Sequence, residues 1–168
     1  MCTELKTKKL TAMALLTAVA MILSYVEAML PSIGIPGVKM GLANIAVVFA
    51  LYRLGWREAA AISLVRVVLM ALLFTGVAAM LYSLAGAAVS LLLMTALKKT
   101  GLFSAVGISV AGGVGHNAGQ VLLAMWMLDT TELIYYLPVL ALSGVIAGVL
   151  IGFAGGMLVN RMKKVSGL

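Results

Sequence analysis

Residues 59–97 read AAAISLVRVVLMALLFTGVAAMLYSLAGAAVSLLLMTAL, and Arg66 is the one charged residue among them. Charged pairs close this stretch on both sides, with Arg57 and Glu58 before it and Lys98 and Lys99 after it. A helix that crosses about 30 Å of hydrocarbon needs roughly 20 apolar residues. The stretch therefore predicts two transmembrane helices in succession, with a turn at Gly76.

The composition extends this interpretation to the whole chain, because 64% of the residues are hydrophobic and 10% are charged. Soluble domains ordinarily contain about 25% charged residues, so lipid is expected to be the outer solvent. Six spans with short loops use nearly all 168 residues. We predict an all-α, polytopic membrane protein with a single transmembrane domain, residues 1–168. The expected spans are about 10–30, 40–55, 58–75, 78–97, 104–128 and 133–159.

The basic residues predict the orientation of these spans. Threading six spans places ten of the 12 lysines and arginines on one side: Lys6, Lys8, Lys9, Arg53, Arg57, Lys98, Lys99, Arg161, Lys163 and Lys164. By the positive-inside rule this side is cytoplasmic. We expect a multi-pass protein of the cell membrane with both termini in the cytoplasm. The net charge of +7 lies at the ends of apolar segments, so we expect membrane lipid as a partner and no nucleic acid.

Two features leave alternatives open. The boundary at Thr75 and Gly76 is weak, and a merged or re-entrant segment there is the alternative to two spans. Small residues four apart form faces that let helix backbones approach closely in lipid. Gly144, Gly148, Gly152 and Gly156 make such a face in the last span. Ala14 and Ala18 do so in the first span, either for packing within the bundle or for docking another membrane subunit.

Polar residues at membrane depth are costly and indicate function by default. Arg66 cannot deprotonate, so it must face the interior and meet an acceptor there. His116 and Gln120 share one helix face, with Asn117 beside them. The candidate ligand-binding residues are Asn44, Arg66, His116, Asn117, Gln120, Lys39 and Glu27. This set favours a partly apolar small molecule with a carboxylate, phosphate or polarised carbonyl.

Structural roles are the alternative for each of these residues. Arg66 can bridge helix carbonyls or pair with Glu27, and an intramembrane histidine such as His116 is often a packing residue. Glu27 and Lys39 lie near the interface, where water can solvate them. Gly112, Gly113 and Gly115 precede the polar group. They predict either an unwound helix with exposed carbonyls or the close approach of a neighbouring helix.

Several motifs that would indicate catalysis do not occur in the sequence. It contains no Walker A segment, no aspartate-rich DDxxD motif, no CxxC and no HExxH. We therefore expect no enzyme activity of its own, no catalytic residues, no metal site and no cofactor.

Several segments carry a resemblance to a known family. They are PGVKMGLAN at 36–44, ALYRLG at 50–55, SLVRV at 63–67, SVAG at 109–112 leading to HNAGQ at 116–120, YYLP at 135–138 and Ser143-Gly144. In these the chain resembles the heptaprenyl diphosphate synthase component I family, also called the Gx transporter family. The resemblance covers nearly the whole chain in order.

The resemblance implies two different functions. The architecture looks like the substrate-binding S component of energy-coupling-factor (ECF) transporters, which carry small-residue faces such as Ala14 and Ala18 on the first helix. Such proteins work with a transmembrane coupling subunit and ATPases. The family name instead implies a membrane subunit of an isoprenoid, menaquinone or flavin-linked electron-transfer system.

Overall fold

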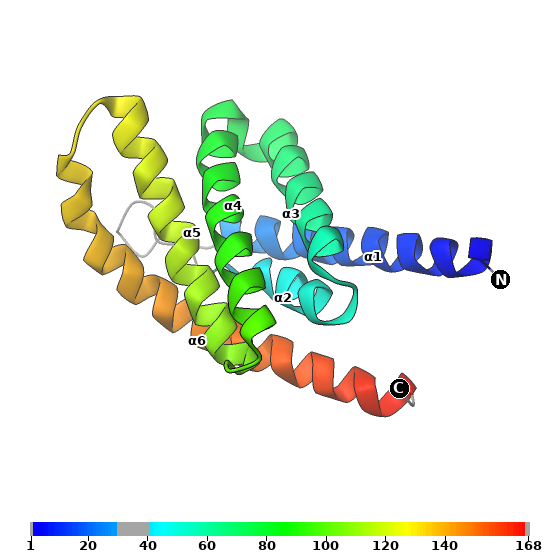
Figure 1. The fold of residues 1–168 in the computed structure, drawn as a ribbon. Helices are drawn as coiled ribbons and strands as arrows, with labels where there is room; N and C mark the ends of the chain where they lie inside the picture. The colour runs from blue at the N-terminus through cyan, green and yellow to red at the C-terminus, as the bar shows by residue number, and fades with distance from the viewer. Residues whose placement is uncertain (1, 30–40, 167–168) are drawn as a thin grey trace.

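The computed structural model describes residues 2–29 and 41–166, and their regular structure is helical throughout (Figure 1). The elements in chain order are α1 (Cys2–Met29), α2 (Asn44–Arg53), α3 (Trp56–Met70), the π-helical turn η1 (Ala71–Thr75), α4 (Gly76–Thr100), α5 (Ala105–Leu128), the 3-10 turn η2 (Glu132–Tyr136) and α6 (Leu137–Ser166). The predicted all-α class is confirmed for these residues. The connection expected between the first two spans and the predicted site residue Lys39 lie outside them.

Three helical segments are long and apolar enough to cross a membrane by length and composition. They are Thr7–Met29 in α1, Trp56–Thr100, which comprises α3, η1 and α4, and Glu132–Met162, which comprises η2 and most of α6. α5 is also long, with 24 residues, but His116, Asn117 and Gln120 lower the hydropathy of its middle. The long apolar helices suggest insertion into a membrane. The number of crossings stays a prediction.

α2 differs from the predicted span 40–55. It has 10 residues, and at about 1.5 Å per residue it reaches roughly half of a 30 Å hydrocarbon core. Although short, α2 lies at the centre of the fold, where Val47, Val48 and Leu51 are almost fully buried. Its burial among other helices explains its hydrophobicity better than a complete crossing of its own does.

The chain reverses between α3 and α4, at the weak boundary that the sequence indicated. Gly76 has φ +80° and ψ 171°, a conformation that glycine adopts readily and other residues rarely. The π-helical turn η1 precedes it, and α3 and α4 then lie side by side (Figure 1). Two helices in a hairpin therefore replace the alternative of one merged helix.

α5 packs closely against α4 on one side and α6 on the other. A Cβ atom added at Gly144 would lie 2.9 Å from Gly113 of α5, and one added at Gly148 would lie 2.5 Å from the Cα atom of Val110. The glycine face of α6 thus serves packing within the bundle. Gly113 lies in this contact, and α5 continues as a helix through it. Of the two expectations for its glycines, unwinding is wrong and close approach is confirmed.

α1 packs on α2 and α3 through one face, where Ala20 is fully buried with Leu16 and Leu23 around it. Ala14 and Ala18 lie on the opposite, exposed face. Packing within the described helices therefore does not account for this pair of small residues.

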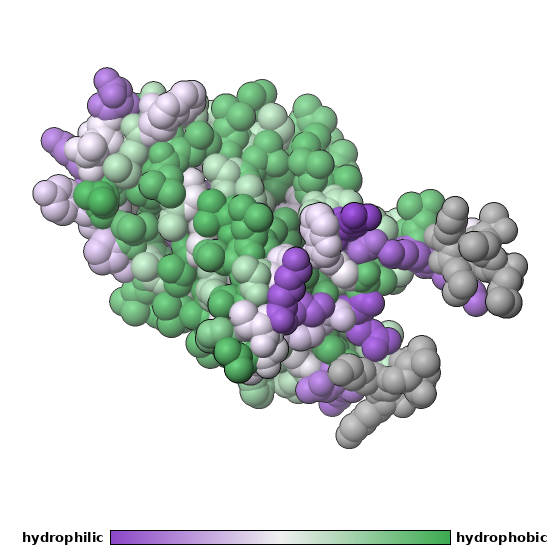
Figure 2. All heavy atoms as spheres, in the orientation of Figure 1, coloured by the Kyte–Doolittle hydropathy of each residue, from purple (hydrophilic) through white to green (hydrophobic). Residues whose placement is uncertain are grey.

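The face shown in Figure 2 has a broad hydrophobic middle with hydrophilic residues toward its two ends. Large apolar side chains such as Leu72, Leu92, Trp126 and Leu150 are at least two-thirds exposed, which is unusual in water. At one end Lys9 of α1 pairs with Glu58 of α3 at 2.5 Å. At the same end Lys98 of α4 donates a hydrogen bond to the carbonyl of Leu51 in α2 at 2.5 Å.

Candidate functional site

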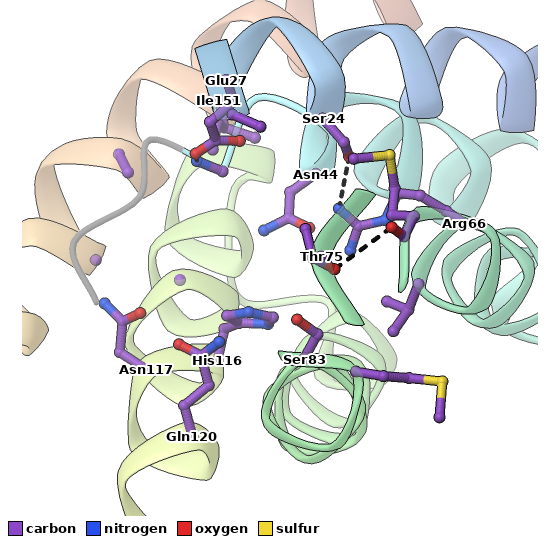
Figure 3. A pocket seen from close by; sticks show the side chains of 18 residues that line it. Ser24, Glu27, Asn44, Arg66, Thr75, Ser83, His116, Asn117, Gln120 and Ile151 are labelled. Atoms are coloured by element: carbon purple, nitrogen blue, oxygen red, sulfur yellow. Dashed lines mark hydrogen bonds between the residues drawn. The ribbon is translucent and has the colours of Figure 1, made fainter. Parts of the chain in front are cut away.

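The helices line a partly open cavity of about 160 Å³ to which α1, α2, α3, α4, α5 and α6 all contribute residues (Figure 3). Six of the seven predicted ligand-binding residues line it: Glu27, Asn44, Arg66, His116, Asn117 and Gln120. The seventh, Lys39, lies outside the described residues. Polar groups that are far apart in the sequence thus face one interior space, as their cost in lipid requires. Their role in binding a ligand stays a prediction.

Arg66 is the permanent cation of the described cavity wall. It lies in the second half of α3, and its Nη1 donates a hydrogen bond to the Ser24 hydroxyl of α1 at 3.3 Å. Its Nε atom is buried and has no hydrogen-bond partner among the described residues. A guanidinium carries five N–H donors, so one long hydrogen bond to a hydroxyl satisfies a small part of its capacity.

Glu27 lies in the same cavity wall but binds elsewhere. Its two carboxylate oxygens accept hydrogen bonds from the backbone amides of Gly41 at 2.5 Å and Leu42 at 3.1 Å. These amides precede the first turn of α2, and Gly41 has φ +68°, so the carboxylate stabilises the positive end of this helix. Glu27 and Arg66 attract each other across the cavity, but no carboxylate of the described residues lies within ion-pair distance of Arg66.

His116 is held against α4 by a glycine that the sequence did not single out. A Cβ atom added at Gly86 would lie 2.7 Å from the carbonyl oxygen of His116 and 2.9 Å from its ring atoms Cε1 and Nδ1. A Cβ atom added at Gly119, about one turn further along α5, would likewise lie 2.7 Å from the carbonyl oxygen of Ala85. The two glycines bring the backbones together and place the imidazole in the cavity wall.

Asn117 uses its amide group mainly to tie α5 to α6. Its Nδ2 donates to the carbonyl of Leu140 at 2.5 Å and contacts the hydroxyl of Ser143 at 3.4 Å. Ser143 donates to the same carbonyl at 2.8 Å. The Asn117 side chain is buried. It lines the edge of the cavity and also holds α5 against α6.

The polar side chains form two groups on opposite sides of the cavity (Figure 3). Arg66, Ser24, Asn44 and Thr75 lie on one side, and His116, Gln120 and Ser83 lie on the other. Thr75 and Ser83 were not predicted as site residues. Serine and threonine are common in transmembrane helices, where a hydroxyl can bond a carbonyl of its own helix, as Thr75 does to Met70 at 3.4 Å. The sequence therefore gives no signal for them.

The cavity suits binding of an acceptor group better than coordination of a metal. Arg66, the amides of Asn44 and Gln120 and several hydroxyls supply hydrogen-bond donors. Within residues 7–29 and 41–162, where side chains are described, no three histidine, cysteine or acidic residues gather as ligands for a metal ion.

The fold and the site together define an all-helical protein of membrane character with a polar cavity lined by its helices. The chain belongs to the heptaprenyl diphosphate synthase component I family, whose model matches residues 16–158. The family expected from the sequence motifs is thereby confirmed. No curated protein and no solved structure matches the chain.

Proposed function

We propose that the chain is the membrane-embedded substrate-binding subunit of an ECF-type transporter. It would take up a small, partly apolar molecule that carries an anionic or carbonyl group. The observation that carries this proposal is Arg66, a half-buried side chain in the cavity wall whose buried Nε has no hydrogen-bond partner among the described residues and whose Nη1 meets one serine hydroxyl.

The energetics of Arg66 support a binding role. Leaving a charged group without partners in a low-dielectric interior costs several kcal/mol. Glu27 does not meet this demand, since its oxygens bind the amides of Gly41 and Leu42. A ligand with an acceptor group would meet it, and the gain in hydrogen bonding would become binding free energy.

The arrangement of charges supports six crossings with both termini in the cytoplasm. The start of α1, the turn between α2 and α3, and the end of α4 meet at one end of the molecule, through Lys9–Glu58 and Lys98–Leu51. Asp129 and Glu132 follow α5 at its other end. In this arrangement α2 forms the cytoplasmic part of the second crossing, and the positive residues lie inside the cell.

Transport would require partners, because the chain has no nucleotide-binding motif. The exposed face of α1 with Ala14 and Ala18 is the proposed docking surface for a transmembrane coupling subunit that works with ATPases. Small residues on a lipid-facing helix permit close approach of a second helix.

The family name supports a second candidate, a membrane subunit of an isoprenoid, menaquinone or flavin-linked electron-transfer system. The same cavity would then hold the head group of a quinone or a prenyl diphosphate. A heptaprenyl chain is far larger than a cavity of about 160 Å³, so most of it would have to lie outside the described walls. We favour the transporter subunit for this reason, and we propose that the chain is not an enzyme on its own.

Native mass spectrometry of the protein purified from membranes tests the binding role. We expect a small molecule to co-purify with the wild type and with Arg57→Gln, and to be lost in Arg66→Gln. Arg57 is a matched control because it lies on the same helix, exposed at its first turn beside Trp56. Equal retention of the molecule in Arg66→Gln, or a wild type that carries none after gentle extraction, would contradict the proposal.

A further inference from the structure

The charge, size and polar groups of the cavity wall together define the ligand more narrowly than the polarity of the cavity alone. Building on the proposed binding role, we infer that the ligand is a ring-sized carboxylic acid, bound as a monoanion with its carboxylate on Arg66 and Ser24 and a second, neutral polar group on His116, Gln120 and Ser83.

Charge is the first reason. The described wall contains one permanent cation, Arg66, and one carboxylate, Glu27. Of these two charges, the carboxylate is already hydrogen-bonded to backbone amides, whereas the guanidinium is not paired with a carboxylate. These two charges cancel in the sum, but Arg66 still lacks acceptors, and the planar fork of arginine matches the two oxygens of one ligand carboxylate. A diphosphate would bring further negative charge into the same space as Glu27.

Size is the second reason. The cavity volume is about 160 Å³, which is close to the roughly 150 Å³ of an engineered protein cavity that binds benzene. Val67, Met70 and Ile151 supply apolar wall between the polar groups. The part of the ligand that the cavity holds is therefore about one six-membered ring in size, and a long prenyl chain would extend out of it.

The far side of the cavity is the third reason. His116, Gln120 and Ser83 lie opposite Arg66 (Figure 3), and an amide and a hydroxyl both donate and accept hydrogen bonds. Such groups recognise a neutral hydroxyl or carbonyl better than a second charge. The ligand accordingly has a charged end toward α1 and α3 and a neutral polar end toward α4 and α5.

Four probes test this assignment on the full chain in lipid nanodiscs, after detergent exchange has removed co-purified small molecules. They are 4-hydroxybenzoate, its neutral isostere 4-hydroxybenzamide, benzoate and geranyl diphosphate, each titrated by ligand-observed NMR. We expect the hydroxy acid to bind about tenfold or more tightly than the amide, the scale of a charge-assisted hydrogen bond. Benzoate should bind more weakly than the hydroxy acid, and Ser83→Ala should reduce that difference.

Variants locate the effect at Arg66. Arg66→Gln should remove the preference for acid over amide, and Arg57→Gln should keep it. The comparison of acid and amide uses the wild-type protein, so it remains valid even where a variant fails to fold. Equal binding of acid and amide, or no binding of the acid, overturns the carboxylate assignment. Geranyl diphosphate that binds more tightly than the hydroxy acid and displaces it also overturns that assignment, and it leaves the cavity's binding role in place. The binding role itself fails if native mass spectrometry finds no co-purifying molecule, or finds it equally retained in Arg66→Gln.

Discussion

Gly86 is the position where a single methyl group should disturb the site most directly. In Gly86→Ala the new Cβ would lie 2.7 Å from the carbonyl oxygen of His116 and 2.9 Å from two of its ring atoms. Ordinary contacts of such an atom begin near 3.4 Å. α5 cannot simply retreat, because Gly113 on its other side is in contact with Gly144 of α6. The methyl group must therefore separate α4 from α5 and turn the imidazole.

Overpacking of this kind typically costs about 1–3 kcal/mol, and we expect that loss in SDS-induced unfolding of the purified protein. Gly107→Ala is the matched control. Its added Cβ meets Phe103 at an ordinary 3.6 Å, so we expect unchanged stability or a gain of up to about 1 kcal/mol from helix propensity. The co-purified molecule should be reduced in Gly86→Ala and retained in Gly107→Ala. A Gly86→Ala protein that unfolds like the wild type and keeps the molecule would show that close packing at Gly86 does not hold His116 in place.

Three further predictions address the charges, the docking face and the topology. Glu27→Gln should destabilise the ligand-free protein by about 1–2 kcal/mol, since it removes a charge from the start of α2, whereas Arg66→Gln should leave that stability unchanged or raise it, since it removes a charge with few partners. A larger loss in Arg66→Gln would show that the arginine is mainly structural. Ala14→Leu with Ala18→Leu should leave the purified chain folded and weaken co-purification of a membrane partner, because the added side chains push an opposing helix away. Undiminished association would remove this face from the docking surface. A single cysteine at position 130 should be labelled from outside the cell and one at position 100 should not, and outside labelling of position 100 would refute the orientation.

Much of the fold is predictable because lipid imposes strict requirements on a chain. A crossing helix needs a long apolar run, and this requirement locates α1, α3, α4 and α6 in the sequence. The same inference is not valid for α2. Its apolar residues are buried by other helices, so their hydrophobicity does not indicate a full crossing. The requirement for apolar runs also does not decide whether the glycines of α5 unwind the helix or let a neighbouring helix approach, since the sequence shows small residues but not which neighbour they meet.

The site is predictable to the extent that polarity is costly in a membrane. Arg66, His116 and Gln120 must turn inward, and groups that turn inward in one bundle meet in one cavity. The partner of Glu27 is not predictable in this way, because backbone amides such as that of Gly41 carry no sequence signal. Gly86 is missed for a related reason, since its importance depends on the backbone of a different helix.

Arg66 is proposed to supply the charge that binds the ligand inside the helical cavity. The most direct measurement is an experimental structure of the protein purified from membranes with its co-purified molecule. We predict non-protein density between Arg66 and His116, with an acceptor group within hydrogen-bond distance of the guanidinium. A side chain of Arg66 that points into lipid, or a dry wall of aliphatic side chains between Arg66 and His116, would contradict the account.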